Sequence, residues 1–217
     1  MCYNLFNFIR QFVTILSLNK TRESDGHFMP IFVLYGCGLR PFFVSGATIM
    51  RNYSRFLAHA AIIAALYAVL THFQNILLPG SATWAIQMRL SEALCILAFF
   101  TPAAPVGLAV GCLVFNLTFA AALPLDFLIG TLATYFAGKV MWWTRNVKVG
   151  SYPLPGMLMP ALLNALLVGW ELSVYIGGGF WMNALYVAIG EAAVLLTIGT
   201  ILYYAMKKRH LDTRLFR

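Results

Sequence analysis

The sequence predicts an all-α membrane protein, a bundle of six transmembrane helices. Of its 217 residues, 61% are apolar and only 10% are charged, and the mean hydropathy is +0.79. An ordinary soluble domain carries about 25% charged residues, so this chain has too few ionised groups to cover a soluble surface. Its 17 Phe, 10 Tyr and 5 Trp exclude a disordered chain, which would have no core in which to bury them.

Six apolar segments follow residue 50, and breaks rich in Pro, Gly or polar residues separate them. Each is expected to be a helix, because a segment in lipid must satisfy its own backbone hydrogen bonds. The second is the shortest: twelve residues counted from Arg89 rise only about 18 Å, so it is either a short helix or a re-entrant element. The segments are Phe56–Leu78, Leu90–Phe100, Val106–Leu123, Pro124–Trp143, Met157–Ile176 and Phe180–Met206.

The basic residues predict the orientation of this core. If the segments alternate across the membrane, only Arg89 falls on the side opposite to the other basic residues that flank them. Those residues are Arg51, Arg55, Arg145, Lys148, Lys207, Lys208 and Arg209. Since Lys and Arg favour the cytoplasmic side, both ends of the core are expected to be cytoplasmic. The net charge of +8 is therefore attributed to topology rather than to nucleic-acid binding.

The chain is expected to divide into an extension (1–50), the six-helix core (51–210) and a cytoplasmic tail (211–217). The extension is poorly defined, because its apolar stretch Phe28–Ala47 is interrupted by prolines and glycines. Two interpretations stay open: an extra membrane segment, or residues upstream of the natural start. The second is favoured because the sequence from Met50 (MRNYSR) is typical of a cytoplasmic start.

Polar side chains gather in the outer half of the bundle, where each needs a structural or functional reason. They form the expected substrate site: Trp84, Arg89, Glu92, Asn116, Glu171, Asn183, Tyr186 and Glu191. Arg89 can neutralise only one of the three glutamates. The surplus negative charge predicts either a cationic or donor-rich ligand or protonated carboxyl groups. Aromatic residues beside this region, Trp170 and Trp181 among them, either stack on a flat ligand or mark the membrane interface.

Structural roles for the same polar residues also stay open. Arg89 and Glu92 are three residues apart and suit a local ion pair on one helical face. Asp126 lies in a first helical turn, where an acidic side chain stabilises the helix dipole. Asn164 suits a hydrogen bond between helices.

The first core segment carries small residues at helical spacing. Such a stripe lets two helices approach closely, either inside the bundle or against another membrane subunit. The functional interpretation is partner docking through Ala60, Ala61, Ala64, Ala65 and Ala68.

Catalytic and metal-binding motifs are not found in the sequence. It has no GxSxG, HExxH or P-loop pattern, and its four cysteines are scattered without CxxC spacing. The prediction is a protein that is not an enzyme and that uses neither a metal nor a cofactor.

Several segments resemble the QueT family. They are LYAVLT (66–71), IQMRLSEAL (86–94), FFTPAA (99–104), NALLVGWE (164–171) and WMNALYVAIGE (181–191). The resemblance covers about residues 50–208. It implies a six-helix S-component, the substrate-binding subunit of an energy-coupling factor (ECF) transporter in the cytoplasmic membrane of a prokaryote. It also implies docking through an alanine-rich first helix onto a transmembrane coupling subunit, which two cytoplasmic ATPases drive.

The substrate that the resemblance implies is a queuosine precursor, a 7-deazaguanine such as the 7-aminomethyl form or queuine. We expect Glu171 or Glu191 to bind the guanine edge and Glu92 to bind the ammonium group. Three other functions stay open: an S-component for another small heterocyclic nutrient, an intramembrane enzyme that uses the acidic residues, and a packing subunit without a ligand.

Overall fold

The computed structural model describes residues 30–35, 38–43, 46–79, 88–119, 122–150 and 152–209, with side chains from Asn52 onward. The chain forms two compact units, Met1–Asn52 and Tyr53–Arg217. In the first unit, strands β1 (Pro30–Tyr35) and β2 (Gly38–Phe43) pair antiparallel, with Pro30 opposite Phe43. These strands lie within the stretch considered for an extra membrane segment.

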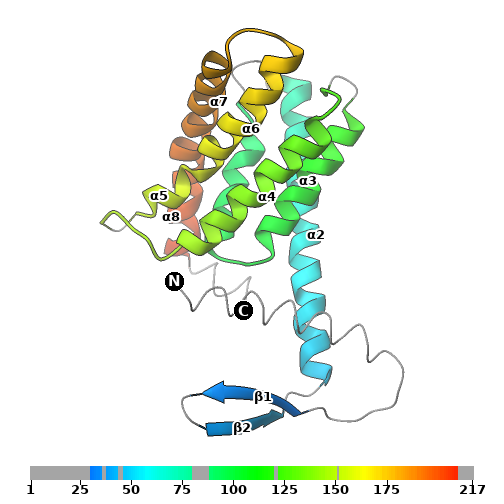
Figure 1. Cartoon of the computed structure of the whole chain (residues 1–217), viewed down its shortest axis with the longest axis vertical. Coiled ribbons are helices and arrows are strands. Elements are labelled where there is room, and N and C mark those ends of the chain that lie inside the picture. Colours follow the sequence, from blue (N-terminus) through cyan, green and yellow to red (C-terminus); the bar gives the residue numbers. More distant parts are fainter. Residues whose placement is uncertain are drawn as a thin grey trace. The chain divides into compact units, whose positions relative to one another are not determined.

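The second unit is a helical bundle. Its elements are α2 (Gly46–Leu77, which begins in the first unit), the 3₁₀ helix η1 (Leu90–Phe99), α3 (Ala104–Thr118), α4 (Asp126–Thr144), α5 (Leu154–Met157), α6 (Met159–Tyr175), α7 (Phe180–Val194), the π-helical turn η2 (Leu195–Gly199) and α8 (Thr200–Lys208). Figure 1 shows α7 beside α6, α6 beside α4 and α4 beside α3. The helix η1 contacts α3, α4, α7, η2 and α8, so it is central to the bundle.

Proline and glycine end the helices where the sequence predicts a break. Pro105 and Pro160 stand in the first turns of α3 and α6, where a missing amide hydrogen breaks no helical bond. The turn between α6 and α7 uses Gly177 and Gly178, whose φ angles of +86° and +82° suit glycine.

Among the described residues, three helices are long and apolar enough to cross a membrane: Asn52–Leu77, Leu154–Tyr175 and Phe180–Lys208. The helix α4 has 19 residues but includes Asp126 and Lys139, while η1 and α3 are shorter apolar helices. The prediction of a helical membrane protein is confirmed at this level, and six crossings stay a prediction. The helix η1 is longer along its axis than an α-helix of the same ten residues would be. Ten 3₁₀ residues rise about 20 Å, against about 15 Å for ten α-helical residues.

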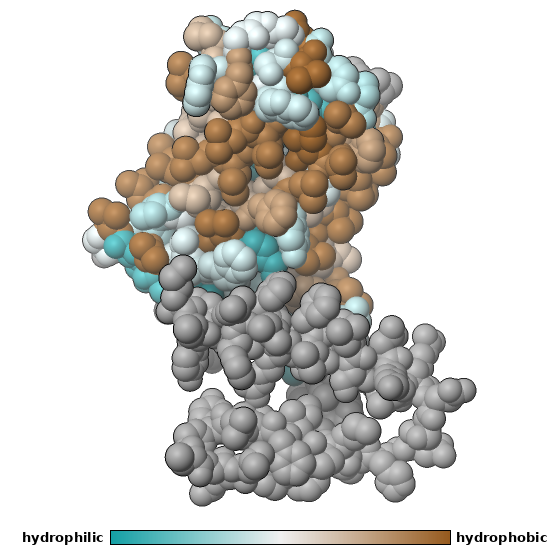
Figure 2. All heavy atoms as spheres, in the orientation of Figure 1, coloured by the Kyte–Doolittle hydropathy of each residue, from teal (hydrophilic) through white to brown (hydrophobic). Residues whose placement is uncertain are grey.

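The surface of the bundle has the polarity that a bilayer requires. Figure 2 shows an apolar band across the visible face, with polar residues beyond it on both sides. Large apolar side chains such as Ile62, Leu132 and Ile201 are exposed on the bundle. An exposed apolar surface of this extent is typical of a membrane-facing or partner-facing protein.

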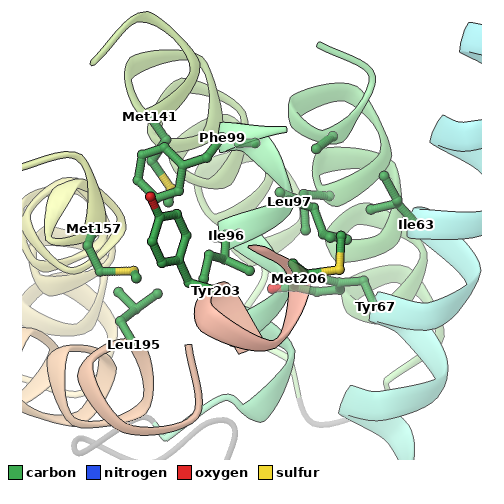
Figure 3. Close-up of a cluster of buried hydrophobic side chains, with 14 of the residues drawn as sticks. Ile63, Tyr67, Ile96, Leu97, Phe99, Met141, Met157, Leu195, Tyr203 and Met206 are labelled. Carbon is green, nitrogen blue, oxygen red and sulfur yellow. The ribbon is translucent and has the colours of Figure 1, made fainter. Parts of the chain in front are cut away.

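An apolar core packs around the later turns of η1 (Figure 3). Ile96 and Phe99 of η1 pack there with Met157, Leu195 and Tyr203. The first turns of η1 hold the polar residues Ser91 and Glu92 instead. The helix η1 therefore runs from a polar region into the apolar core.

Candidate functional site

The start of η1 supplies an acidic group to the site. In a 3₁₀ helix, residues three apart lie on the same edge, so Glu92 and Cys95 are neighbours. The Cys95 thiol donates to Glu92 Oε2 at 3.0 Å, and the Tyr67 hydroxyl of α2 donates to Glu92 Oε1 at 2.5 Å. Both oxygens of this fully buried carboxylate therefore have a donor from the protein.

A polar stripe on α2 holds the start of η1 in place. Tyr67, Thr71 and Gln74 follow one another at helical spacing and are all buried. Gln74 Oε1 accepts from the amide of Leu90 at 2.7 Å, and its Nε2 donates to the carbonyl of Met88. The first amides of a helix have no partner within the helix, so this side chain acts as a cap. Gln74 thereby fixes the backbone on both sides of Arg89.

Arg89 connects this end of η1 with the start of α4. Its Nη2 lies 3.7 Å from Asp126 Oδ2, and both side chains are buried. Asn116 of α3 donates from Nδ2 to the carbonyl oxygen of Asp126 at 2.8 Å. Asp126, the acidic partner of Arg89, is therefore held by a hydrogen bond from α3 to its backbone as well as by the ion pair.

Helices α6 and α7 contribute two further carboxylates. Asn164 Nδ2 donates to both oxygens of Glu191, at 2.7 and 2.8 Å. Glu171 lies two turns after Asn164 on the same face of α6 and is fully buried. Within the part of the chain that the structure describes, neither of its oxygens has a hydrogen-bond donor.

The charges of these groups act on one another. Arg89 interacts electrostatically with all four carboxylates: Asp126, Glu92, Glu171 and Glu191. Among the side chains that the structure describes, these four are all the acidic residues, and each is buried. One guanidinium does not neutralise four carboxylates, so the cluster carries excess negative charge unless some of them hold protons.

The cluster also has more acceptors than donors. Within the described residues, the buried carboxylate and amide oxygens without a hydrogen-bond donor are Asn116 Oδ1, Asp126 Oδ1, Asn164 Oδ1 and both oxygens of Glu171. Buried polar atoms are normally satisfied in a native state. This arrangement therefore suits a small ligand that is rich in N–H donors, or a cation.

The structure brings together most of the predicted site residues. Arg89 interacts electrostatically with Glu92, Glu171 and Glu191. Asn116 donates a hydrogen bond to Asp126, which is the ion-pair partner of Arg89. The ion pair with Asp126 gives this acidic residue a role beyond the helix dipole.

Two predicted residues, Asn183 and Tyr186, lie in the first two turns of α7. Asn183 donates to the carbonyl of Gly177 at 3.0 Å, so it stabilises the turn between α6 and α7. Tyr186 is half-buried one turn later. Trp84 lies outside the described residues.

The other aromatic candidates face outward. Trp170 and Trp181 are 51% and 78% exposed, and the rings of Phe180 and Trp181 lie 4.9 Å apart. Exposed Trp at the end of a membrane helix is typical of an interfacial anchor. Of the two interpretations, the structure thus favours the interface over stacking on a ligand.

Residues that the sequence analysis left out of the site prove important to it. Tyr67, Gln74 and Asp126 each hold Glu92 or Arg89 in position. The sequence indicates the position of Tyr67 and Gln74, because both continue the buried alanine face of α2 at intervals of three and four residues. In the described ranges, no group of His, Cys, Asp and Glu suits a metal ion.

The alanines of α2 fall on two faces. Ala60, Ala64 and Ala68 are buried, whereas Ala61 and Ala65 are exposed. A Cβ added to Gly107 would lie 2.6 Å from the Ala60 carbonyl oxygen, and one added to Gly111 would lie 2.7 Å from that of Ala64. Ala60 and Ala64 therefore pack against α3 inside the bundle, whereas Ala61 and Ala65 stay exposed.

Comparisons with known proteins agree with this architecture. The family model described as QueT transporter matches residues 57–208, well over half of the chain. Residues 1–56 lie outside the matched range. Comparison with the curated proteins and with the solved structures found no significant match.

Proposed function

Because the chain belongs to the QueT transporter family, we propose that it is the substrate-binding membrane subunit, or S-component, of an ECF transporter that imports a queuosine precursor. Membership of a transporter family and three apolar helices of spanning length make it a multi-pass membrane protein. In the proposed assembly it is not an enzyme, and the ATPases of the transporter supply the energy.

One observation carries the binding role: four buried carboxylates interact electrostatically with a single cation, Arg89. A packing subunit without a ligand would gain little from this arrangement, because burying unpaired charge is costly. A 7-deazaguanine matches it chemically. The guanine edge offers a ring N–H and an amino group side by side, and the 7-aminomethyl form adds a cationic ammonium group. Carboxylates accept such paired donors well.

Access to the site is proposed from the outer side of the cytoplasmic membrane. The apolar core around Phe99, Leu195 and Tyr203, which lies beyond the polar start of η1, supports entry from the polar end. The basic residues of the core support this orientation, with both ends of the core on the cytoplasmic side. Movement of the substrate inward then requires reorientation by a coupling subunit and two ATPases.

Calorimetry on the purified full-length protein in detergent tests this function. The ligand panel holds 7-aminomethyl-7-deazaguanine, queuine, guanine and an unrelated vitamin such as riboflavin. We expect a Kd below about 1 μM for a deazaguanine, which corresponds to about −8 kcal/mol, and much weaker binding of riboflavin. Tighter binding of riboflavin, or no binding of any deazaguanine, would overturn the proposal.

Mass spectrometry of the same mixtures separates binding from catalysis. A binding subunit returns its ligand chemically unchanged after incubation. A deazaguanine product that accumulates with time and protein concentration would instead support the intramembrane enzyme.

A further inference from the structure

The four carboxylates of the cluster differ in the hydrogen-bond donors and cations that the protein supplies to them. Glu92 accepts from Tyr67 and Cys95, and Glu191 accepts twice from Asn164. Asp126 pairs with Arg89 through Oδ2. Glu171 is fully buried, and yet no side chain or backbone group among the described residues donates to either of its oxygens.

This difference has an energetic meaning. A carboxylate that leaves water loses its hydration, and only hydrogen bonds or nearby cations restore the loss. Asp126 repels the charge of Glu171, while Arg89, already paired with Asp126, attracts it. The protein thus holds Glu171 in a buried position without supplying the donors that an ionised carboxylate needs.

The same face of α6 is rich in free acceptors. Asn164 lies two turns before Glu171, about 10 Å along the helix, and its Oδ1 is also without a donor. A flat ligand with N–H groups along its edge complements such a face. Two parallel donors on one carboxylate define orientation as well as adding affinity.

We propose that Glu171 binds the ligand directly, by accepting two parallel N–H hydrogen bonds from the amidine-like edge of the ligand. Glu92 and Glu191 are then positioning residues. This inference rests on the proposed function and narrows it, because the sequence left Glu171 and Glu191 as equal candidates. It also assigns Glu92 to the support of η1 rather than to the ligand's ammonium group.

Two ligands and matched Glu→Gln variants test the assignment. The ligands are 7-aminomethyl-7-deazaguanine and its analogue without the 2-amino group, which lacks one of the two parallel donors. The wild-type protein is expected to bind the analogue about 100-fold more weakly, because a site built around a donor rejects a ligand without it. E171Q is expected to bind the full ligand about 100-fold more weakly and to discriminate less than about threefold between the two ligands.

The variants E191Q and E92Q serve as matched comparisons. Each changes a buried carboxylate that already has protein donors, so we expect a lower temperature of thermal unfolding but retained discrimination between the two ligands. E171Q removes no hydrogen bond within the protein and is expected to unfold at the wild-type temperature or above. Glu171→Asp provides a second variant that keeps the charge; it is expected to bind at least about tenfold more weakly and still to discriminate.

The outcomes separate this inference from the proposed function. Tight wild-type binding with full discrimination in E171Q overturns the role of Glu171 and leaves the transporter function standing; it would mean that a protonated Glu171 lies beside the ligand unused. If E191Q loses the discrimination between the two ligands and E171Q keeps it, then Glu191 is the residue that accepts the paired donors, and the inference is overturned. A wild-type protein that binds no deazaguanine overturns both.

Discussion

The guanidinium of Arg89 lies 3.7 Å from the carboxylate of Asp126, and both groups are buried in the bundle. The pair joins the entry to η1 with the first residue of α4. It also explains the one basic residue that the charge pattern placed on the outer side. Arg89 does not mark a loop in water; it is held inside the protein by an acidic partner.

Breaking this pair on one side is expected to destabilise the protein strongly. Arg89→Met leaves Asp126 buried without its cation, and Asp126→Leu leaves Arg89 without this carboxylate. Removal of one partner of a buried ion pair typically costs about 3–5 kcal/mol. The double variant, which removes both charges, should recover part of the loss. Thermal unfolding in detergent measures all three, and two single losses that add fully in the double variant would contradict coupling between these residues.

The hydroxyl of Tyr67 is expected to matter for stability in the absence of any ligand. Tyr67→Phe removes the donor to Glu92 Oε1 and leaves that oxygen unsatisfied at the centre of the bundle. Hydrogen bonds to charged groups contribute about 1.5–3 kcal/mol. The free energy of unfolding in detergent should fall by that amount. Tyr175→Phe, at an exposed tyrosine on α6, is the matched control and should have almost no effect; equal losses would contradict the role of Tyr67.

The helix boundaries were largely predictable, because proline and glycine act locally. Pro105 and the Gly177–Gly179 turn lie at helix ends that the sequence predicted, whereas α6 begins at Met159, two residues after the predicted Met157. The family resemblance was predictable too and is confirmed, since short motifs are read directly from residues. The number of membrane crossings stays a prediction. Composition also does not reveal that η1 is a 3₁₀ helix, which rises further per residue than an α-helix.

The site was predictable in its chemistry and less so in its pairings. Buried acidic residues in apolar segments indicate a functional cluster whichever side chains meet. The partner of Arg89 is 37 residues away in the sequence, at Asp126, and such a contact leaves no local pattern. The neighbouring alanines Ala60 and Ala61 show the same limit: both belong to the small-residue stripe, yet they lie on different faces of α2.

Close packing between α2 and α3 predicts strong sensitivity at two glycines. A Cβ at Gly107 would lie 2.6 Å from the carbonyl oxygen of Ala60, which belongs to a backbone that has little freedom to move. Overpacking of this kind typically costs about 1–3 kcal/mol. Gly107→Ala and Gly111→Ala should therefore lower the temperature of unfolding. Gly179→Ala is the control, because nothing lies within 4 Å of its added Cβ. Unchanged stability of both α3 variants would contradict direct contact between these helices.

The division of the alanines on α2 predicts a separation between folding and partner docking. Ala61→Phe and Ala65→Phe place bulk on the exposed face, so the bundle and ligand binding should be unaffected, whereas a close-fitting partner helix would be displaced. Ala64→Phe places the same bulk against α3 and should impair the fold itself. Co-purification with the coupling subunit and its ATPases, scored beside ligand affinity, distinguishes the two effects. Leu66→Phe, at an exposed position on another side of α2, controls for bulk alone. If Ala61→Phe and Ala65→Phe assemble as well as Leu66→Phe does, then the exposed alanines are not the docking face, and another part of the surface must meet the partner.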